Sequence, residues 1–212
     1  MSSANSSEQQ FESLLTKSDL SEVAIDYAEI FIDRTLAEGI LKEIPVIKTV
    51  LATMDFANSF GRYLFTKKIY QFLFELTSIS EDKRAQKINE INESKQYQSK
   101  IGEIIFEQLE KVESDYKPKM LGRLFKAFIE EKISFSEYLR LASAIQFCFV
   151  LDLIEFKRYK IGQNIGYISD QIFVAGFVTM KITDNVWDDK SNFERERIFT
   201  LTRLGKLYID YS

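Results

Sequence analysis

Residues 134–156 read SFSEYLRLASAIQFCFVLDLIEF, and this stretch decides the fold class. Ser134 and Glu137 have the spacing of a capping box, in which a serine hydroxyl and a glutamate three residues later bind the free backbone N–H groups of a helix N-terminus. The residues from Leu139 to Phe156 are apolar on nearly every side of a helix, which predicts a helix surrounded by others. We expect this helix to be the hub of a helical body.

The segments before this stretch repeat apolar residues three or four positions apart, the period of a helix with one buried face. The pattern predicts helices from Asp19, from Pro45, after Ser80, over 101–112 and over 121–129. We expect Gly61 to divide or kink the helix from Pro45. The helices over 101–112 and 121–129 are expected to pack antiparallel.

The sequence changes character after residue 158. FVTMKI (177–182) and RIFTLT (197–202) are β-prone runs on either side of a polar loop, a pattern typical of a β-hairpin. The apolar positions of LGKLYIDY (204–211) then predict a short final helix. We therefore expect a mainly α chain with a flexible polar leader over 1–18, a helical bundle-like body over 19–158 and a small α+β module over 159–212.

Two residue counts exclude much familiar enzyme chemistry. The 212 residues include no histidine and one cysteine, Cys148, so an intramolecular disulfide cannot form and a zinc site of Cys and His has no ligands. The glycine motifs of dinucleotide and nucleoside triphosphate sites are also absent from the sequence. The sequence predicts a cytoplasmic protein that is not an enzyme and has no metal, no cofactor and no indicated small-molecule substrate.

The charge pattern supplies the first candidate contacts. The net charge is −4, and residues 1–40 hold eight acidic and two basic side chains. The densest basic cluster is KPKMLGRLFK, which contains Lys117, Lys119, Arg123 and Lys126. We interpret this cluster either as a solvated helix face or as a contact for an acidic partner, including the acidic N-terminal segment. Trp187, in the acidic loop of the hairpin, is a further candidate partner contact.

The C-terminal motifs resemble a known family. VAGFV (174–178), a strand, a polar loop and RIFTLTRLGKLY (197–208) resemble the last helix and wing of bacterial winged-helix domains, with their GL(I/V)…(Y/F)xLTxxG pattern. The resemblance covers roughly residues 161–211 and implies a winged-helix-like module. In DNA-reading members the helix before the wing carries Arg, Lys, Asn or Gln toward the bases. The corresponding stretch here has no basic residue beyond Lys160, so the candidate nucleic-acid contacts are Lys157, Arg158 and Lys160.

The middle of the chain carries a second resemblance. Residues 44–76 (IPVIKTVLATMDFANSFGRYLFTKKIYQFLFEL) and 117–141 resemble a widespread group of uncharacterised bacterial proteins associated with phage defence and abortive infection. This group offers no catalytic motif to transfer. We expect a non-enzymatic protein-interaction or regulatory protein of bacterial origin that acts through a protein partner or self-association.

Two alternatives stay open. One is a nucleic-acid-binding regulator that uses the module over 159–212. The other is a membrane-surface-associated protein that uses the apolar segment 44–76, with Lys67 and Lys68 near anionic lipid.

Overall fold

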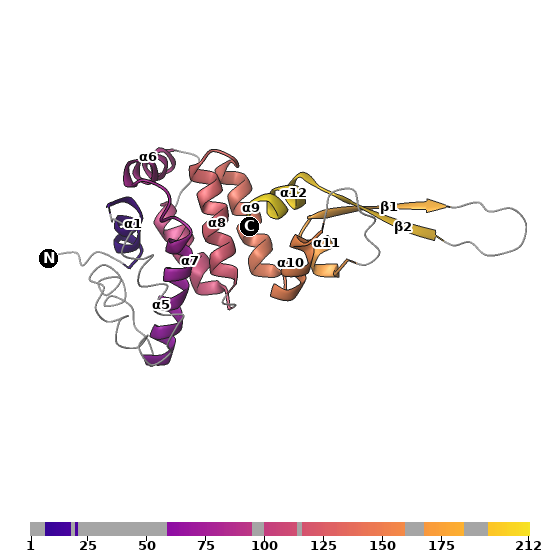
Figure 1. Cartoon of the computed structure of the whole chain (residues 1–212), viewed down its shortest axis with the longest axis horizontal. Coiled ribbons are helices and arrows are strands. Elements are labelled where there is room, and N and C mark those ends of the chain that lie inside the picture. The colour runs from indigo at the N-terminus through magenta and orange to yellow at the C-terminus, as the bar shows by residue number, and fades with distance from the viewer. Residues whose placement is uncertain are drawn as a thin grey trace, which may run out of the picture. The chain divides into compact units, whose positions relative to one another are not determined.

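A computed structural model describes residues 7–17, 20, 59–94, 100–113, 116–159, 168–184 and 195–212. These residues form nine helices and one two-stranded antiparallel hairpin near the C-terminus (Figure 1). The predicted mainly α class with a C-terminal hairpin is therefore confirmed. The chain divides into two compact units, Met1–Lys132 and Ile133–Ser212.

The described part of the first unit is helical. Its helices are α1 (Ser7–Lys17), α5 (Ser59–Phe74), α6 (Glu81–Asn92), α7 (Ile101–Lys111) and α8 (Lys117–Ile129). Helix α8 packs mainly on α5 and α7 mainly on α1, rather than on each other as the sequence predicted. The reason for the first of these is Gly122, because a Cβ there would lie 2.6 Å from the carbonyl oxygen of Phe72, so α8 and α5 cross with their backbones nearly in contact.

Helix α1 corrects the predicted flexible leader (1–18) for its described residues, 7–17. Phe11, Leu14 and Leu15 have the spacing of a helix stripe and are all buried. Glu12 accepts hydrogen bonds from the backbone N–H of Gly102 at 3.3 Å and from the amide of Asn92 at 3.0 Å. The carboxylate therefore lies at the N-terminus of α7, where a negative charge is favourable.

The remaining helix predictions in the first unit have mixed outcomes. Ser80 occupies the N-cap position of α6, although its side chain makes no capping hydrogen bond, and the helical residues of α5 include Gly61 as the third. The predicted helix from Asp19 and the first part of the helix from Pro45 lie outside the described residues.

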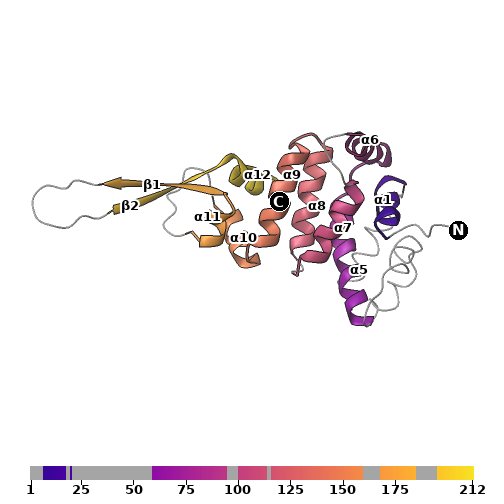
Figure 2. The same cartoon turned by 180° about the vertical axis from the view of Figure 1, so that it is seen from behind.

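The described part of the second unit combines four helices with the hairpin. The elements are α9 (Phe135–Phe147), α10 (Val150–Lys157), α11 (Asp170–Val174), β1 (Val178–Asp184), β2 (Arg195–Leu201) and α12 (Arg203–Tyr211). The strands pair from Val178 opposite Leu201 to Asp184 opposite Arg195. Both views show the hairpin extending away from the helices of its own unit (Figures 1 and 2).

An aromatic cluster forms the core of the second unit and explains where the chain divides. Phe156 of α10 stacks on Phe177 and Tyr208, with ring centroids 5.4 and 5.9 Å apart. The hydroxyl of Tyr208 donates to the carbonyl oxygen of Leu153 at 2.9 Å. Because α10 has its core partners around β1 and α12, it belongs with the C-terminal module, and the boundary lies at 132/133 instead of the predicted 158/159.

The predicted hub helix over residues 139–156 is two helices in the structure. Cys148 and Phe149 between them have extended backbone, with ψ of 149° and 138°. The side chain of Gln171 accepts a hydrogen bond from the backbone N–H of Phe149, which fixes the break. As a result Phe147, Phe149 and Leu151 are each more than half exposed, although the sequence predicted a helix buried on all sides.

Candidate functional site

Exposed apolar side chains concentrate in the second unit. Among the described residues nine large apolar side chains are exposed, and seven of them lie within 133–212. The seven are Phe147, Phe149, Leu151, Phe173, Val174, Met180 and Ile182. An aromatic side chain presents about 150–250 Å², so the three phenylalanines alone leave about 300 Å² of apolar surface in water. The largest contiguous apolar patch on a typical monomer has about this size and is often functional.

Part of this surface is a groove of about 810 Å³ within the second unit. One wall is a face of α9, made by Leu139, Arg140, Ser143, Ala144 and Phe147. The opposite wall comes from the end of α11 (174–176) and from the start of α12 (202–204). The side chains of Ser143 and Ala144 are small, so the middle of the groove is open to a backbone or a bulky side chain.

The groove has a basic end and an apolar end. Arg203 donates to Glu137 at 2.7 Å, which places the start of α12 beside the first turns of α9. The bond from Phe149 to Gln171 places α11 beside the last turn of α9. Arg140 and Arg203 therefore lie toward one end, and Phe147 and Val174 lie toward the other. Seven residues at a rise of about 1.5 Å separate Arg140 from Phe147 by about 10 Å along α9.

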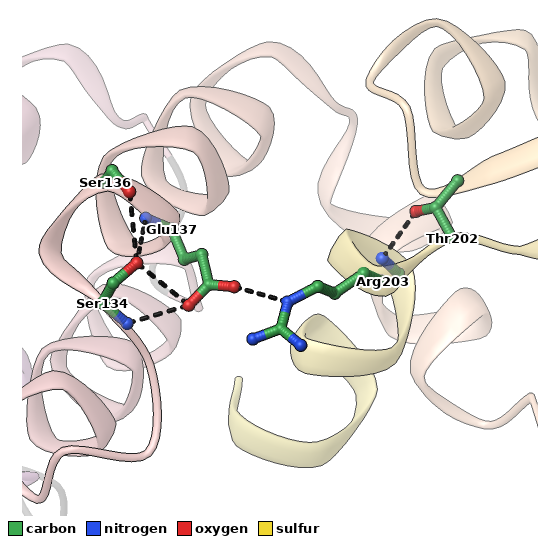
Figure 3. Close-up of polar contacts among 6 residues, drawn as sticks. Ser134, Ser136, Glu137, Thr202 and Arg203 are labelled. Carbon is green, nitrogen blue, oxygen red and sulfur yellow. Dashed lines mark hydrogen bonds and ion pairs between the residues drawn. The ribbon is translucent and has the colours of Figure 1, made fainter.

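The electrostatics of the basic end depend on Glu137. Its carboxylate accepts hydrogen bonds from Arg203 and from the backbone N–H of Ser134, while its own N–H donates to the Ser134 hydroxyl (Figure 3). The guanidinium of Arg203 first, and then the Ser134 backbone, hold the pKa of Glu137 below its usual value. Glu137 is thus satisfied internally, and none of the residues that line the groove is acidic.

The LTRLG sequence over 201–205 builds the α12 wall. Thr202 caps α12 by accepting from the N–H of Gly205 at 3.0 Å, and its hydroxyl lies 2.7 Å from the carbonyl oxygen of Gly176. A Cβ on Gly205 would lie 2.1 Å from the carbonyl oxygen of Phe177. The threonine and the glycine therefore fix the start of α12 against the segment between α11 and β1.

The predicted basic cluster is engaged within the first unit. Arg123 pairs with Glu75 at 3.2 Å, and Lys126 donates to the hydroxyl of Ser78 at 2.7 Å. Lys117 is buried and Lys119 is half-buried. These contacts tie α8 to the turn that follows α5. Trp187 lies outside the described residues.

The structure describes two of the three predicted nucleic-acid contacts. Lys157 is half-buried, Arg158 is exposed, and Lys160 lies outside the described residues. The helix before the hairpin, α11, exposes Asp170, Phe173 and Val174. Its one amide side chain, Gln171, is bound to the backbone between α9 and α10.

The described part of the apolar segment 44–76 lies in the core of the first unit. Helix α5 buries Phe65, Ile69, Phe72 and Leu73, and among its side chains whose burial the structure describes Leu64 is the one exposed large apolar side chain. Residues 44–58 lie outside the described residues. Over the ranges that the structure describes, no helix combines the length and the apolar character needed to cross a bilayer.

Metal ligands and relatives add no further assignment. The described residues contain no group of three or more His, Cys, Asp or Glu side chains that is able to hold a metal ion. Comparisons with models of protein families, with curated proteins and with solved structures found no match. The candidate site therefore depends on the groove and its surroundings.

The sequence reasoning did not find Arg140, Phe147 or Val174 as site residues. The sequence did contain one signal for exposed apolar surface, because residues 139–156 are apolar on nearly every side of a helix and neighbouring helices need not cover all sides. We interpreted that signal as burial, whereas the structure exposes the excess at the break between α9 and α10.

Proposed function

We propose that this chain is a non-enzymatic protein-interaction or regulatory protein whose second unit is the binding module. The observation that carries the proposal is the concentration of exposed apolar side chains in residues 133–212, part of them around one groove. Large exposed apolar surface on a folded unit is the usual mark of a protein contact. A bacterial origin, a role in phage defence and a cytoplasmic location belong to the same proposal and rest on the sequence.

The order of helices, hairpin and capped final helix supports a winged-helix-like module. The exposed side chains of α11 favour a protein over a nucleic acid, because one is acidic and two are apolar. A helix that reads DNA presents Arg, Lys, Asn or Gln instead. The burial of α5 removes much of the apolar surface that a membrane contact through segment 44–76 requires.

The test compares capture by the immobilised full chain and by two variants from an extract of the native host. In the surface variant, Phe147→Ser and Val174→Ser remove side chains that are 55% and 68% exposed. In the control, Leu64→Ser removes a side chain that is 38% exposed on the first unit. Sedimentation of the purified chain measures self-association in parallel.

We expect a host protein, or a second copy of the chain, to be retained by the wild type and by the control and lost from the surface variant. Equal retention by all three proteins would contradict the proposal. A monomer that retains nothing would contradict it as well.

A further inference from the structure

We infer that the groove between α9, α11 and α12 binds an amphipathic helix that carries an acidic side chain about two turns from an apolar one. This inference rests on the proposed function and specifies the partner's chemistry. Its basis is the charge and the polarity of the groove, which the structure gives residue by residue.

The charge of the groove selects a carboxylate. Two of its lining residues, Arg140 and Arg203, are basic and none is acidic. Arg140 is exposed and has no hydrogen-bond or ion-pair partner among the described residues. Arg203 holds Glu137 through Nε, and its side chain remains 78% exposed. An approaching carboxylate therefore meets one free guanidinium and the outer side of a second, a geometry that favours charge-assisted hydrogen bonds.

The other end of the groove selects an apolar side chain. Phe147 is 55% exposed and Val174 is 68% exposed, and covering them removes apolar surface from water. The small side chains of Ser143 and Ala144 lie between the two ends and let the backbone of the occupant approach.

The spacing of the two ends selects a helix. About 10 Å separates the position of Arg140 from that of Phe147 along α9, and about seven residues of an α-helix span the same length. A partner helix with an apolar residue and a glutamate or aspartate seven positions apart places both on one face, opposite both ends. Docking of one helix face into a groove is a common mode of peptide recognition.

The test selects from a displayed library of random peptides of about sixteen residues on the immobilised full chain, a length at which helices become marginally stable. Fluorescence anisotropy then measures the affinity of the enriched peptides for purified variants. Arg140→Glu reverses the charge at the basic end. Ser143→Phe fills the middle from an exposed position. The matched control is Arg158→Glu, the same reversal at an exposed arginine of this unit that does not line the groove.

We expect enriched peptides to pair an acidic with an apolar residue about seven positions apart. Arg140→Glu should weaken their binding by about tenfold or more, the range measured for close charge pairs. Ser143→Phe should abolish binding, Arg158→Glu should change it by less than about twofold, and Glu→Lys in the peptide should restore binding to Arg140→Glu.

Enriched peptides without a carboxylate, or with equal affinity for wild type and Arg140→Glu, would overturn the inference. If those peptides still lost affinity on Phe147→Ser with Val174→Ser, the proposed protein-interaction function would stand. If the affinity of the peptides were unchanged by every variant of the second unit, the inference about the groove and the proposed function would both be contradicted.

Discussion

Replacing Gly205 with alanine is expected to destabilise the second unit. Gly205 lies in the first turn of α12, where a Cβ would come within 2.1 Å of the carbonyl oxygen and 3.0 Å of the carbonyl carbon of Phe177. That carbonyl accepts from the N–H of Thr202 at 3.0 Å and lies 3.1 Å from its hydroxyl. The position of the added Cβ is fixed by the backbone of residue 205, and the atoms it meets are backbone atoms of Phe177. No side-chain rotation therefore relieves the clash.

The magnitude follows from two opposing effects. Gly→Ala in an unobstructed helix interior stabilises by about 1 kcal/mol. Added methyl groups in packed sites cost about 1–3 kcal/mol, and here the contact is more than 1 Å shorter than the 3.4 Å at which ordinary contact begins. We therefore expect a net loss of about 2 kcal/mol. In a unit of this size that lowers the melting temperature by about 8–16 °C.

Scanning calorimetry of the full chain measures this change, because it resolves the transitions of two units when they differ. The matched control is Lys206→Ala, at the next and exposed position of the same helix, which should shift the melting temperature by less than about 4 °C. An unchanged or higher melting temperature for Gly205→Ala would refute the seating of α12 on Phe177. The groove wall made by residues 202–204 would then be misplaced too.

Four further outcomes are expected. Gln71→Leu should raise the urea midpoint by the equivalent of about 1–2 kcal/mol, because the Gln71 amide is 1% exposed and neither of its polar atoms has a hydrogen-bond partner among the described residues; a lower midpoint would contradict this. Arg203 and the helix cap hold the pKa of Glu137 below its ordinary value of 4.5, so this carboxylate stabilises the fold above that pH and the contribution is lost as the pH falls through the lowered pKa. Glu137→Gln should therefore lose less stability than the wild type between about pH 6 and pH 3 in melting experiments, and parallel losses would argue against the pairing. A fragment of residues 133–212 should melt cooperatively by circular dichroism, whereas a fragment of 159–212 should not because it lacks α10; the opposite result would restore the boundary at 158/159. Random duplex DNA at physiological salt should bind more weakly than about 10 μM in an anisotropy titration, and sub-micromolar affinity would favour the nucleic-acid alternative.

The elements of the fold were largely predictable because their signals are local. The capping box at Ser134 and Glu137 and the hairpin runs on either side of the polar loop are confirmed, and Ser80 stands at the N-cap position of α6. Each depends on residues a few positions apart, whose backbone preferences do not require the rest of the chain. The polar composition of residues 1–18 did not predict helix α1. Three apolar residues, Phe11, Leu14 and Leu15, are enough to give this helix a buried face.

The candidate site was not predictable, because its parts are far apart in the sequence. Arg140 and Val174 line the same groove only because hydrogen bonds of Gln171 and Arg203 hold α11 and α12 beside α9. The basic cluster over 117–126 shows the opposite case, in which residues close together in the sequence were predicted as a site but are engaged by other parts of the fold. Arg123 and Lys126 share a helix face in the sequence, but Glu75 and Ser78 reach them from the turn after α5.

The sequence by itself determined that this chain is mainly helical, that a hairpin and a short helix lie near its C-terminus, and that it contains neither a histidine nor a pair of cysteines. Tertiary structure decided where the chain divides and which apolar side chains remain in water. The physical reason is that periodicity shows how much apolar surface a segment carries, whereas burial depends on which other segments cover it. At the break between α9 and α10, Gln171 binds the backbone and leaves Phe147 and Phe149 uncovered.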